Sequence, residues 1–266
     1  AVRGGGGNFG VVTSFNFKLH PHQRTVIGGD VIFPLKDLPN VLAFYADYAQ
    51  SAPDDLFLDF AVASELGKEE GIALVHACYS GPEDQADKVL APIHKAGTVL
   101  NDGIKAVDYV ALQRSWDDSD PRHTASYLKS GFVNDIPDKL VSTVVQNYKA
   151  FNERGTTMFF QHSGGAIGRV PADATAFAHR KSVANMFAVV EWPLGESRES
   201  HVKYIKDYWR DFEPFTDGWY TNEVDDHAAT TVNRNYQGNY DRLVAVKNQY
   251  DPTNLFRLNA NVKPSV

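Results

Sequence analysis

The sequence predicts an α+β fold in which an antiparallel sheet is covered by helices on one face. Strand-length runs occur in pairs with short connections, which favours antiparallel neighbours. Amphipathic stretches with apolar residues at helical spacing separate these pairs. The order strand, helix, strand, strand, helix occurs once and then again in looser form. Helices are therefore expected to gather on one face, which leaves the other face free to cover something else.

The spacing of polar and apolar side chains predicts the elements in the first part of the chain. Residues 11–19 alternate in part between polar and apolar side chains and predict a strand that leaves a glycine turn. A strand at about 25–33 precedes a helix whose apolar positions recur from Leu38 to Tyr48. Strands at 56–64 and 72–80 flank a polar, glycine-containing segment, which is typical of a hairpin loop.

The same patterns continue to the C-terminus, interrupted by the irregular stretch 97–135. Apolar residues at helical spacing mark the helices, and runs rich in aromatic and β-branched residues mark the strands. In chain order the expected elements are a helix at 82–96, a strand at 126–133, a helix that starts at Asp138, strands at 156–163 and 185–192, and helices at 197–212 and 239–250.

Composition and charge exclude several classes of function. The net charge of −7 argues against a nucleic-acid-binding protein, which needs a basic surface. No apolar run is long enough to span a membrane. The single cysteine, Cys78, is expected to be a buried strand residue, and it excludes a disulfide framework and a cysteine-based zinc site. The nine histidines show no metal-ligand spacing, so no metal site is expected.

The N-terminal segment is rich in glycine. The chain starts at Ala1 without an initiator methionine and soon reaches Gly4–Gly7, which is typical of the middle of a longer polypeptide. Targeting signals are therefore expected elsewhere, and the compartment is unknown. The run matches neither the Rossmann fingerprint nor the P-loop. Its backbone is free to approach a pyrophosphate or adenine closely, and the alternative is a flexible linker or turn.

Candidate binding residues lie in aromatic segments. His162 ends an aromatic strand, where it either faces a ligand or is packed in the interior. Trp219, Tyr220, Asn222 and Glu223 combine stacking area with hydrogen-bonding groups, a mixture that binds flavin rings and aromatic substrates. The alternative for this cluster is a core strand. Paired carboxylates elsewhere are interpreted as solvated loop charge, and no nucleophile-elbow motif is present.

The order of four segments is more specific than any of them alone. They are a glycine-rich opening from Arg3 to Thr13, Phe177-Ala178-His179-Arg180 followed by a strand, Tyr220-Thr221-Asn222, and a C-terminal segment over 236–261. In this order they resemble the berberine-bridge-enzyme-like FAD-linked oxidases, in the style of bacterial members, over nearly the whole chain. The opening is similar to the segment that closes the FAD-binding domain of that family.

The resemblance implies a division of the chain into three parts. Residues 1–22 would be the end of an FAD-binding domain, residues 23–215 a substrate-binding α+β domain, and residues 216–266 a C-terminal segment that returns to the FAD-binding domain. The rest of the FAD-binding domain is missing from the N-terminal side. We therefore expect a partner domain, either on the same chain or on a separate one.

The resemblance also implies a cofactor, a reaction and the residues that contact the cofactor. It implies FAD, a hydride taken from an alcohol, amine or related carbon of a small-molecule substrate, and O₂ as acceptor. By the same resemblance the cofactor contacts are Gly7, Asn8, Phe9, Gly10, Val11, Val12, Tyr220 and Asn222. The substrate contacts are expected at His162, Asn185 and Trp219.

Two positions depart from the family pattern. Glu223 stands where plant-type members often have a catalytic tyrosine. Asn185 or Met186 stands where many members have a glutamate in the strand after the Phe-x-His-Arg stretch. Glu223 is then the candidate general base, because a carboxylate near flavin and aromatic rings would be desolvated and its pKa raised. A surface loop glutamate would look the same.

The absent N-terminal part leaves several explanations open. The chain is a proteolytic piece, one half of a split enzyme, or a redeployed substrate domain. The rival function is a non-enzymatic module that grips an aromatic ligand without redox chemistry. On its own, the chain is expected to be inactive as an oxidase.

Overall fold

The computed structural model describes residues 1–115, 117, 124–222, 232–258 and 260–265. The strands are β1 (Thr25–Pro34), β2 (Leu56–Ser64), β3 (Gly71–Tyr79), β4 (Asn101–Asp102), β5 (Lys105–Asp108), β6 (Thr124–Val133), β7 (Gly155–His162) and β8 (Ala184–Pro193). The α-helices are α1 (Leu38–Ser51), α2 (Ala86–His94), α3 (Tyr109–Arg114), α4 (Asp138–Asn147), α5 (Arg198–Trp209), α6 (Val232–Tyr236) and α7 (Tyr240–Tyr250). Short 3-10 helices are η1 (Gly6–Asn8), η2 (Leu35–Asp37), η3 (Glu83–Gln85), η5 (Glu213–Phe215) and η7 (Gln237–Asn239).

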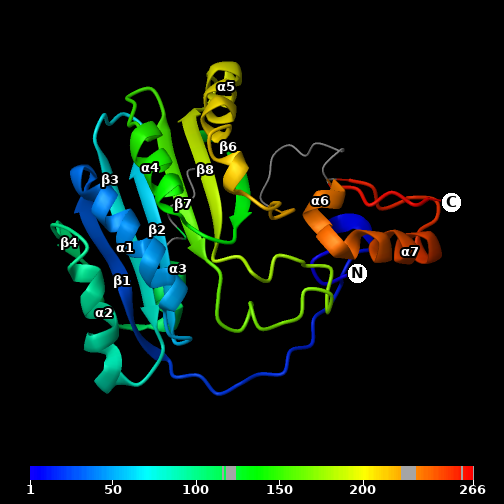
Figure 1. Ribbon diagram of the computed structural model, residues 1–266, viewed down its shortest axis with the longest axis horizontal. Helices are drawn as coiled ribbons and strands as arrows, with labels where there is room; N and C mark the ends of the chain where they lie inside the picture. Colours follow the sequence, from blue (N-terminus) through cyan, green and yellow to red (C-terminus); the bar gives the residue numbers. More distant parts are fainter. Residues whose placement is uncertain (116, 118–123, 223–231, 259, 266) are drawn as a thin grey trace.

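The described strands form one antiparallel sheet, as the sequence predicts. Its order is β4-β1-β3-β2-β7-β8-β6, and β5 pairs with β1 beside β4. Every pair between neighbouring strands is antiparallel. The β2–β3 hairpin is regular along its whole length, from Leu56 opposite Tyr79 to Ser64 opposite Gly71. Figure 1 shows the strands side by side, with β6 nearest the two chain ends.

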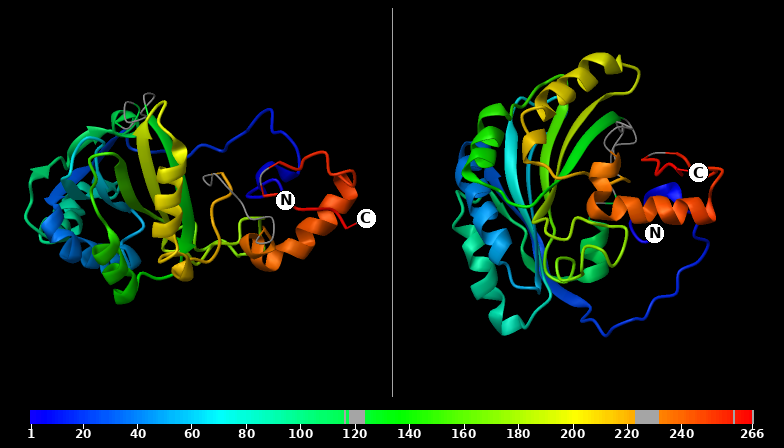
Figure 2. Two further views of the ribbon diagram at one scale, coloured as in Figure 1. Left: turned by 90° about the horizontal axis from the view of Figure 1, so that it is seen from above. Right: turned by 45° about the vertical axis from the view of Figure 1, so that its right-hand side comes forward.

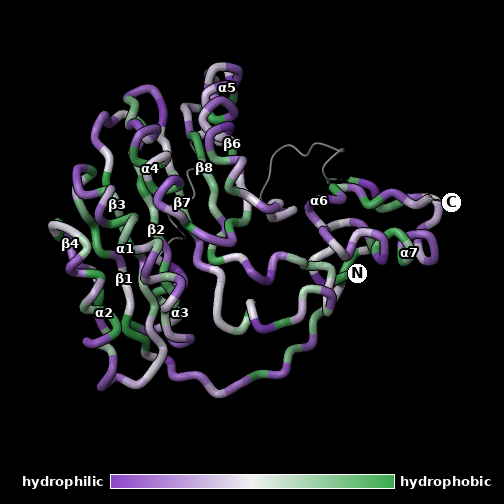
Figure 3. The backbone as a smooth tube through the Cα atoms, viewed as in Figure 1, coloured by the Kyte–Doolittle hydropathy of each residue, from purple (hydrophilic) through white to green (hydrophobic). Residues whose placement is uncertain are grey.

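Side chains alternate between the two faces of this sheet. On one face, residues such as Val31, Phe60, Val75 and Met186 join the main hydrophobic core with side chains of α1, α2, α4 and α5. Figure 3 shows the strands as mainly hydrophobic. The α+β fold with helices on one face is therefore confirmed. The opposite face carries the alternate residues of each strand. Leu112 of α3 approaches Gly28 at its β1 edge, and Phe177 and His179 pack on Phe132 at its β6 edge, so the middle of this face is the less covered part.

A smaller unit, formed by residues 1–10, 232–258 and 260–265 with the loop around Ala176 packed on them, lies beside the sheet. Its core contains Ala176, Val232, Tyr236, Leu243, Ala260 and Val262, with Phe9 packed against them. Figures 1 and 2 show both chain ends in this unit beside α6 and α7. Backbone hydrogen bonds join Phe132 of β6 to the segment Asp217–Gly218, and the Trp219 N–H that follows donates to Asn235 Oδ1 of this unit. The two ends of the sequence thus meet in one core.

Several sequence-based expectations need correction. The strand predicted at 11–19 is wrong: this segment pairs with no described strand, and it forms the extended arc seen in Figure 1. Its alternation is real, but the side chains of Phe15, Phe17 and Leu19 are exposed because no neighbouring strand or helix covers them. Cys78 lies in a strand as expected, yet it is half-buried rather than buried because it is on the less covered face.

The sequence analysis also missed some short elements. In the stretch considered irregular, β4, β5 and α3 form the edge of the sheet. The cluster around Trp219 is a loop, not a core strand, up to the last described residue before the gap, Asn222. Among the described helices, none has the length and apolar character that a membrane crossing requires.

Candidate functional site

A cavity of about 430 Å³ opens between the less covered sheet face and the loops that carry Ile167, Phe177 and Tyr220. Aromatic rings of Phe132, Phe177 and Tyr220 form one part of its wall. Phe132 and Phe177 meet edge to face with ring centroids 5.5 Å apart, and Phe132 and Tyr220 meet similarly at 6.5 Å. Such walls bind flat apolar groups well, and the volume lies in the usual range for small-molecule sites.

Two amide side chains supply polar groups to the same cavity. Gln161 of β7 and Asn185 of β8 are cross-strand partners, so both project from the less covered face. Asn185 is paired on its other side with Phe132 of β6. Gln161 is exposed, whereas Asn185 is buried. Amides that are both donors and acceptors suit a hydroxyl, amine or carbonyl on an aromatic ligand.

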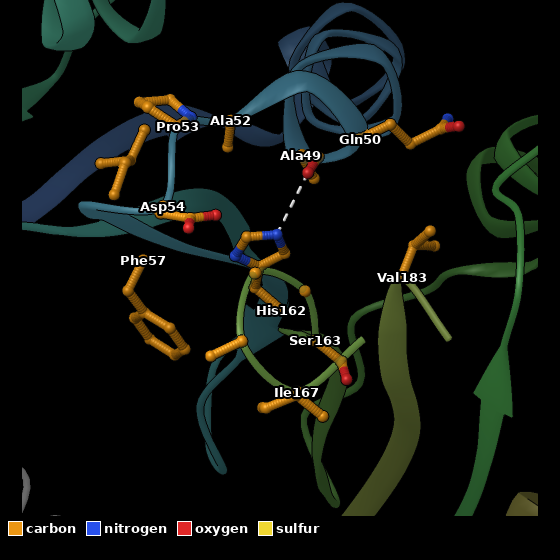
Figure 4. A pocket seen from close by; sticks show the side chains of 14 residues that line it. Ala49, Gln50, Ala52, Pro53, Asp54, Phe57, His162, Ser163, Ile167 and Val183 are labelled. Carbon is orange, nitrogen blue, oxygen red and sulfur yellow. Dashed lines mark hydrogen bonds between the residues drawn. The ribbon is translucent and has the colours of Figure 1, made fainter. Parts of the chain in front are cut away.

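A second cavity, of about 350 Å³, lies at the C-terminal end of α1 (Figure 4). The His162 ring stands near its middle and donates a hydrogen bond from Nε2 to the Ala49 carbonyl oxygen, 3.1 Å away. Burial lowers the pKa of His162. The ring is therefore held neutral, with its Nδ1 as an acceptor.

A line of ionisable groups crosses the same sheet face. The register places His76 of β3 between Asp30 of β1 and Asp59 of β2. His76 Nδ1 lies 2.7 Å from Asp30 Oδ1, and Asp59 Oδ1 accepts a hydrogen bond from the His162 backbone N–H at 2.7 Å. Burial raises the pKa of Asp59 to about 7, although the His162 N–H and the His76 charge act against it. A carboxyl with this pKa can exchange a proton near neutral pH.

The buried imidazole of His179 joins the sheet to the smaller unit. It stacks on Phe132 with a centroid distance of 4.4 Å, and its Nε2 lies 2.8 Å from the Asn235 carbonyl oxygen. Asn235 Oδ1 accepts from the Trp219 backbone N–H at 2.8 Å, which fixes the loop that carries Tyr220. Burial lowers the pKa of His179. Sequence reasoning used His179 only as a family marker and missed this positioning role.

The residues expected to contact the cofactor lie on the smaller unit and the start of the arc. Gly7 is exposed, and a Cβ built on it would meet no atom within 4 Å. Gly10 has φ +138°, and Val11 and Val12 are exposed. Asn8 differs, because its side chain is buried and its amide binds Gly5, Ala260 and Val262 of the same unit. Open glycine backbone next to exposed valines fits one edge of a flat cofactor.

The remaining predicted site residues fall into two groups. His162, Asn185 and Tyr220 line the cavity of about 430 Å³ together. Asn222 is exposed, and its amide donates to the Tyr220 hydroxyl at 3.1 Å. Trp219 is half-buried and faces a different, very small cavity beside His179. Glu223 lies outside the described residues.

Sequence reasoning missed Gln161, Phe132 and Phe177 as lining residues. Gln161 had a detectable signal, because it alternates with the buried Phe160 along β7 and so faces away from the helices. Phe132 and Phe177 had none, since their meeting depends on β6 lying next to β8 and on a long loop returning to it.

Comparison with known proteins bears on this arrangement. Residues 219–263 match the family model described as berberine and berberine like. An FAD-linked oxidoreductase of Dictyostelium discoideum is 28% identical over 99% of this chain and 57% of its own length. An uncharacterized FAD-linked oxidoreductase of Bacillus subtilis is 27% identical over 98% of this chain and 59% of its own.

The fold is also found in solved structures. The 6-hydroxy-D-nicotine oxidase of Arthrobacter nicotinovorans superimposes with a TM-score of 0.83 at 20% identity, covering 99% of this chain and 60% of that one. At this identity the likeness concerns the fold. The chain thus spans less than two thirds of the length of these similar proteins.

Proposed function

Because the chain belongs to the berberine-bridge-enzyme-like family of FAD-linked oxidases and corresponds to the C-terminal half of its members, we propose that it forms the substrate-binding part of an FAD-dependent oxidoreductase. The observation that carries the proposal is the cavity of about 430 Å³, where Gln161, Asn185 and Tyr220 meet aromatic walls on the less covered sheet face. The proposed reaction is oxidation of an alcohol, amine or related carbon, with O₂ as final acceptor.

The three parts of the chain have separate proposed tasks. Residues 23–215 bind the substrate, and residues 1–22 and 216–266 belong with the FAD-binding domain, whose remainder is supplied by the same or a separate chain. Support comes from the shared core of the two chain ends, which is distinct from the core of the sheet. The missing part would then dock beside this smaller unit and over the exposed arc that starts at Val11.

The chain's own residues bind and orient both molecules. Gly7, Phe9, Gly10, Val11 and Val12 are proposed to contact FAD, and Asn8 to hold that segment in shape. Tyr220 and Asn222 approach the flavin from the substrate side. When bound, FAD supplies the acceptor for the hydride, and the aromatic walls exclude water from the reacting carbon.

The substrate is proposed to be a small aromatic compound with a polar group. Asn185 and Gln161 would hydrogen-bond that group and set the carbon's position, and His162 would form part of the wall. Trp219 would contact the substrate from the small neighbouring cavity that it faces. A base must take the proton from the substrate's O–H or N–H as the hydride leaves its carbon. Glu223 is proposed for this role from its place after Tyr220-Thr221-Asn222 in the sequence. Glu223→Gln should slow flavin reduction, and an unchanged rate would remove it from the mechanism.

The test joins this chain to the FAD-binding domain of the organism that it comes from. Two properties of the complete protein are then measured: bound flavin and reduction of that flavin by substrate. The complete protein should be yellow, and aromatic alcohols or amines should bleach its flavin absorbance in the absence of O₂. Asn185→Leu, which keeps the side-chain volume, should weaken substrate binding by up to about tenfold. Asn101→Leu, at an exposed edge position, should not. A complete protein that binds no flavin would refute the proposal.

A second candidate is a binding module without redox chemistry. It is favoured by one observation: aromatic rings of Phe132, Phe177 and Tyr220 and amides of Gln161 and Asn185 already meet in one cavity of the described residues. In that case the colourless chain would bind aromatic ligands tightly, and adding a flavin domain would change nothing.

A further inference from the structure

The two cavities are adjacent chambers with a common wall. Phe57, His162, Ser163 and Ile167 line both of them. Phe57 projects from the less covered face of β2, whereas His162 is the last residue of β7 and reaches the end of α1. The four shared residues place the two chambers side by side, with the His162 ring between them.

We propose that the chamber at the end of α1 is a distal subsite for an elongated aromatic substrate, whose tail ends in a hydrogen-bond donor that His162 Nδ1 accepts. This inference rests on the proposed function, because it assumes that the aromatic head lies between Asn185 and Tyr220. The donor is a hydroxyl or an ammonium group, since both can donate a hydrogen bond to Nδ1.

The His162 ring is fixed in the form that such a tail needs. Its Nε2–H donates to Ala49 O, so the neutral ring carries its lone pair on Nδ1. Among the described residues, Nδ1 has no hydrogen-bond partner. The backbone N–H of His162 donates to Asp59 Oδ1 at 2.7 Å, and this bond holds the end of β7 in place. The acceptor is thus positioned from both its ring and its backbone.

The surroundings of the ring favour a donor over an anion. The chamber lies at the C-terminal end of α1, where the helix dipole and the last carbonyl groups favour positive or donor groups. The carboxylate of Asp54 is at its rim, but Arg169 binds it at 2.7 Å. Nδ1 is therefore an acceptor that a ligand in this chamber can reach, beside the side-chain oxygens of Gln50 and Ser163, whereas Asp54 is already compensated.

The remaining walls suit an apolar linker. Leu56, Phe57, Ile167 and Val183 face the chamber, and Figure 4 shows Phe57, Ile167 and Val183 arranged around the His162 ring. A tail of several methylene groups would bury apolar surface there before its donor reaches Nδ1. The expected substrate class is a phenol or similar arene with an aliphatic tail that ends in a hydroxyl or amine.

The test uses matched probes on the complete flavoprotein. The probes are para-butylphenol and its analogues with a terminal hydroxyl or a terminal ammonium, and calorimetry gives each Kd. The hydroxyl or ammonium should tighten binding about threefold to tenfold relative to the methyl end. A terminal carboxylate in the same position should not.

Two substitutions separate a ligand role from a structural one. His162→Gln places its NH₂ where Nε2 was, keeping the bond to Ala49 while removing the acceptor, and it should abolish the gain. His162→Asn places an oxygen near Nδ1 and should retain part of it. Should the gain persist in His162→Gln, the proposal is wrong, because a purely structural histidine predicts that result.

A spectroscopic readout covers the case in which the variants fail to fold. In the wild-type protein, the ¹⁵N resonance of His162 Nδ1 should shift when the hydroxyl probe binds and stay in place with para-butylphenol. If no probe binds at all, the proposed function itself fails. If para-butylphenol binds but the terminal donor adds no affinity and moves no resonance, only the distal subsite is refuted.

Discussion

The side-chain nitrogen of Lys247 donates a hydrogen bond to the backbone oxygen of Asn8, 2.7 Å away, across a sequence separation of 239 positions. The Lys247 side chain is fully buried and also binds Asp251 Oδ2 at 2.6 Å. Asp251 in turn accepts from the backbone N–H groups of Leu255 and Phe256, so its charge is well satisfied. The hydrogen bond from Lys247 holds the pKa of Asp251 below its usual value. The glycine-rich segment is thereby fixed to α7 and the C-terminal tail.

Asn8→Ala should detach this segment. The Asn8 amide donates to Gly5 O and Ala260 O at 2.9 and 2.8 Å, and its oxygen accepts from Val262 N at 2.8 Å. Removing it leaves buried backbone groups without partners, which should cost about 2–4 kcal/mol of unfolding free energy. Urea unfolding measures this loss, and limited proteolysis near Gly10 should become faster.

Asn8→Asp is the matched control. It keeps the acceptor for Val262 but turns an oxygen toward the carbonyl oxygens of Gly5 and Ala260, so its stability should fall at least as far as that of Asn8→Ala. Equal stability of all three proteins would show that the two chain ends do not depend on this residue.

His179 should make stability fall in mild acid. Burial lowers its pKa from 6.5, so the unfolded chain binds the proton more readily than the folded one. The stabilisation is fully present above pH 6.5 and is lost as pH falls through the lower, folded-state pKa. His179→Gln keeps a donor toward the Asn235 carbonyl but cannot titrate. Its thermal midpoint should therefore change less than that of the wild type between neutral and mildly acidic pH.

The comparison must separate His179 from His162, whose pKa burial also lowers. The double variant with glutamine at both positions should show the smallest change of thermal midpoint with pH. If the profiles of wild type and His179→Gln run parallel, protonation of His179 does not limit stability.

Gly218→Ala should destabilise the junction between sheet and smaller unit. Gly218 has φ +90°, and a Cβ there would lie 2.4 Å from His179 Cε1. Backbone strain and the clash together should cost about 2–5 kcal/mol. Gly195→Ala isolates the first term, because Gly195 has φ +92° but a Cβ there meets nothing within 4 Å. Chemical denaturation of both variants should give the larger loss for Gly218→Ala; similar losses would mean that His179 can move aside.

Local patterns predicted the elements that carry a complete signal in their own sequence. Strands β2, β3 and β8 were predicted within a residue or two of their bounds, because each is a mainly apolar run, and in β3 and β8 burial also alternates between the two faces. The segment 11–19 has the same alternation, but a strand also needs a partner, and none of the described strands pairs with it. Periodicity therefore identified amphipathic segments better than it identified sheet membership.

Convergence between distant segments could not be predicted from patterns. His76 meets Asp30 and Asp59 because β3 lies between β1 and β2, a register that depends on the whole sheet. Lys247 and Asp251 have the spacing of an ordinary surface helix pair, and only the packing of the N-terminal segment buries them. His162, Asn185 and Tyr220 were selected separately, and the strand order brings them to one cavity.

Asp59 should give a pH dependence opposite to that of His179. Burial raises its pKa from 3.8 to about 7, so the folded state binds the proton more tightly. The free energy of unfolding therefore falls by at most about 4 kcal/mol as pH rises from about 4 to about 7, and it is level above that. Asp59→Asn keeps an oxygen for the His162 N–H and removes the charge.

The Asn variant should gain stability relative to the wild type as pH rises through this window, measured by urea unfolding at pH 4, 6 and 8. Asp108→Asn is the control, because the hydrogen bond from Arg24 lowers the pKa of Asp108. This substitution should change the slope of unfolding free energy against pH in the opposite direction or very little. A constant difference between Asp59→Asn and wild type at all pH values would mean that Asp59 ionises as a solvated carboxylate does. In that case Asp59 would not be a proton-exchanging group near neutral pH, and its place on the sheet face would serve substrate binding alone.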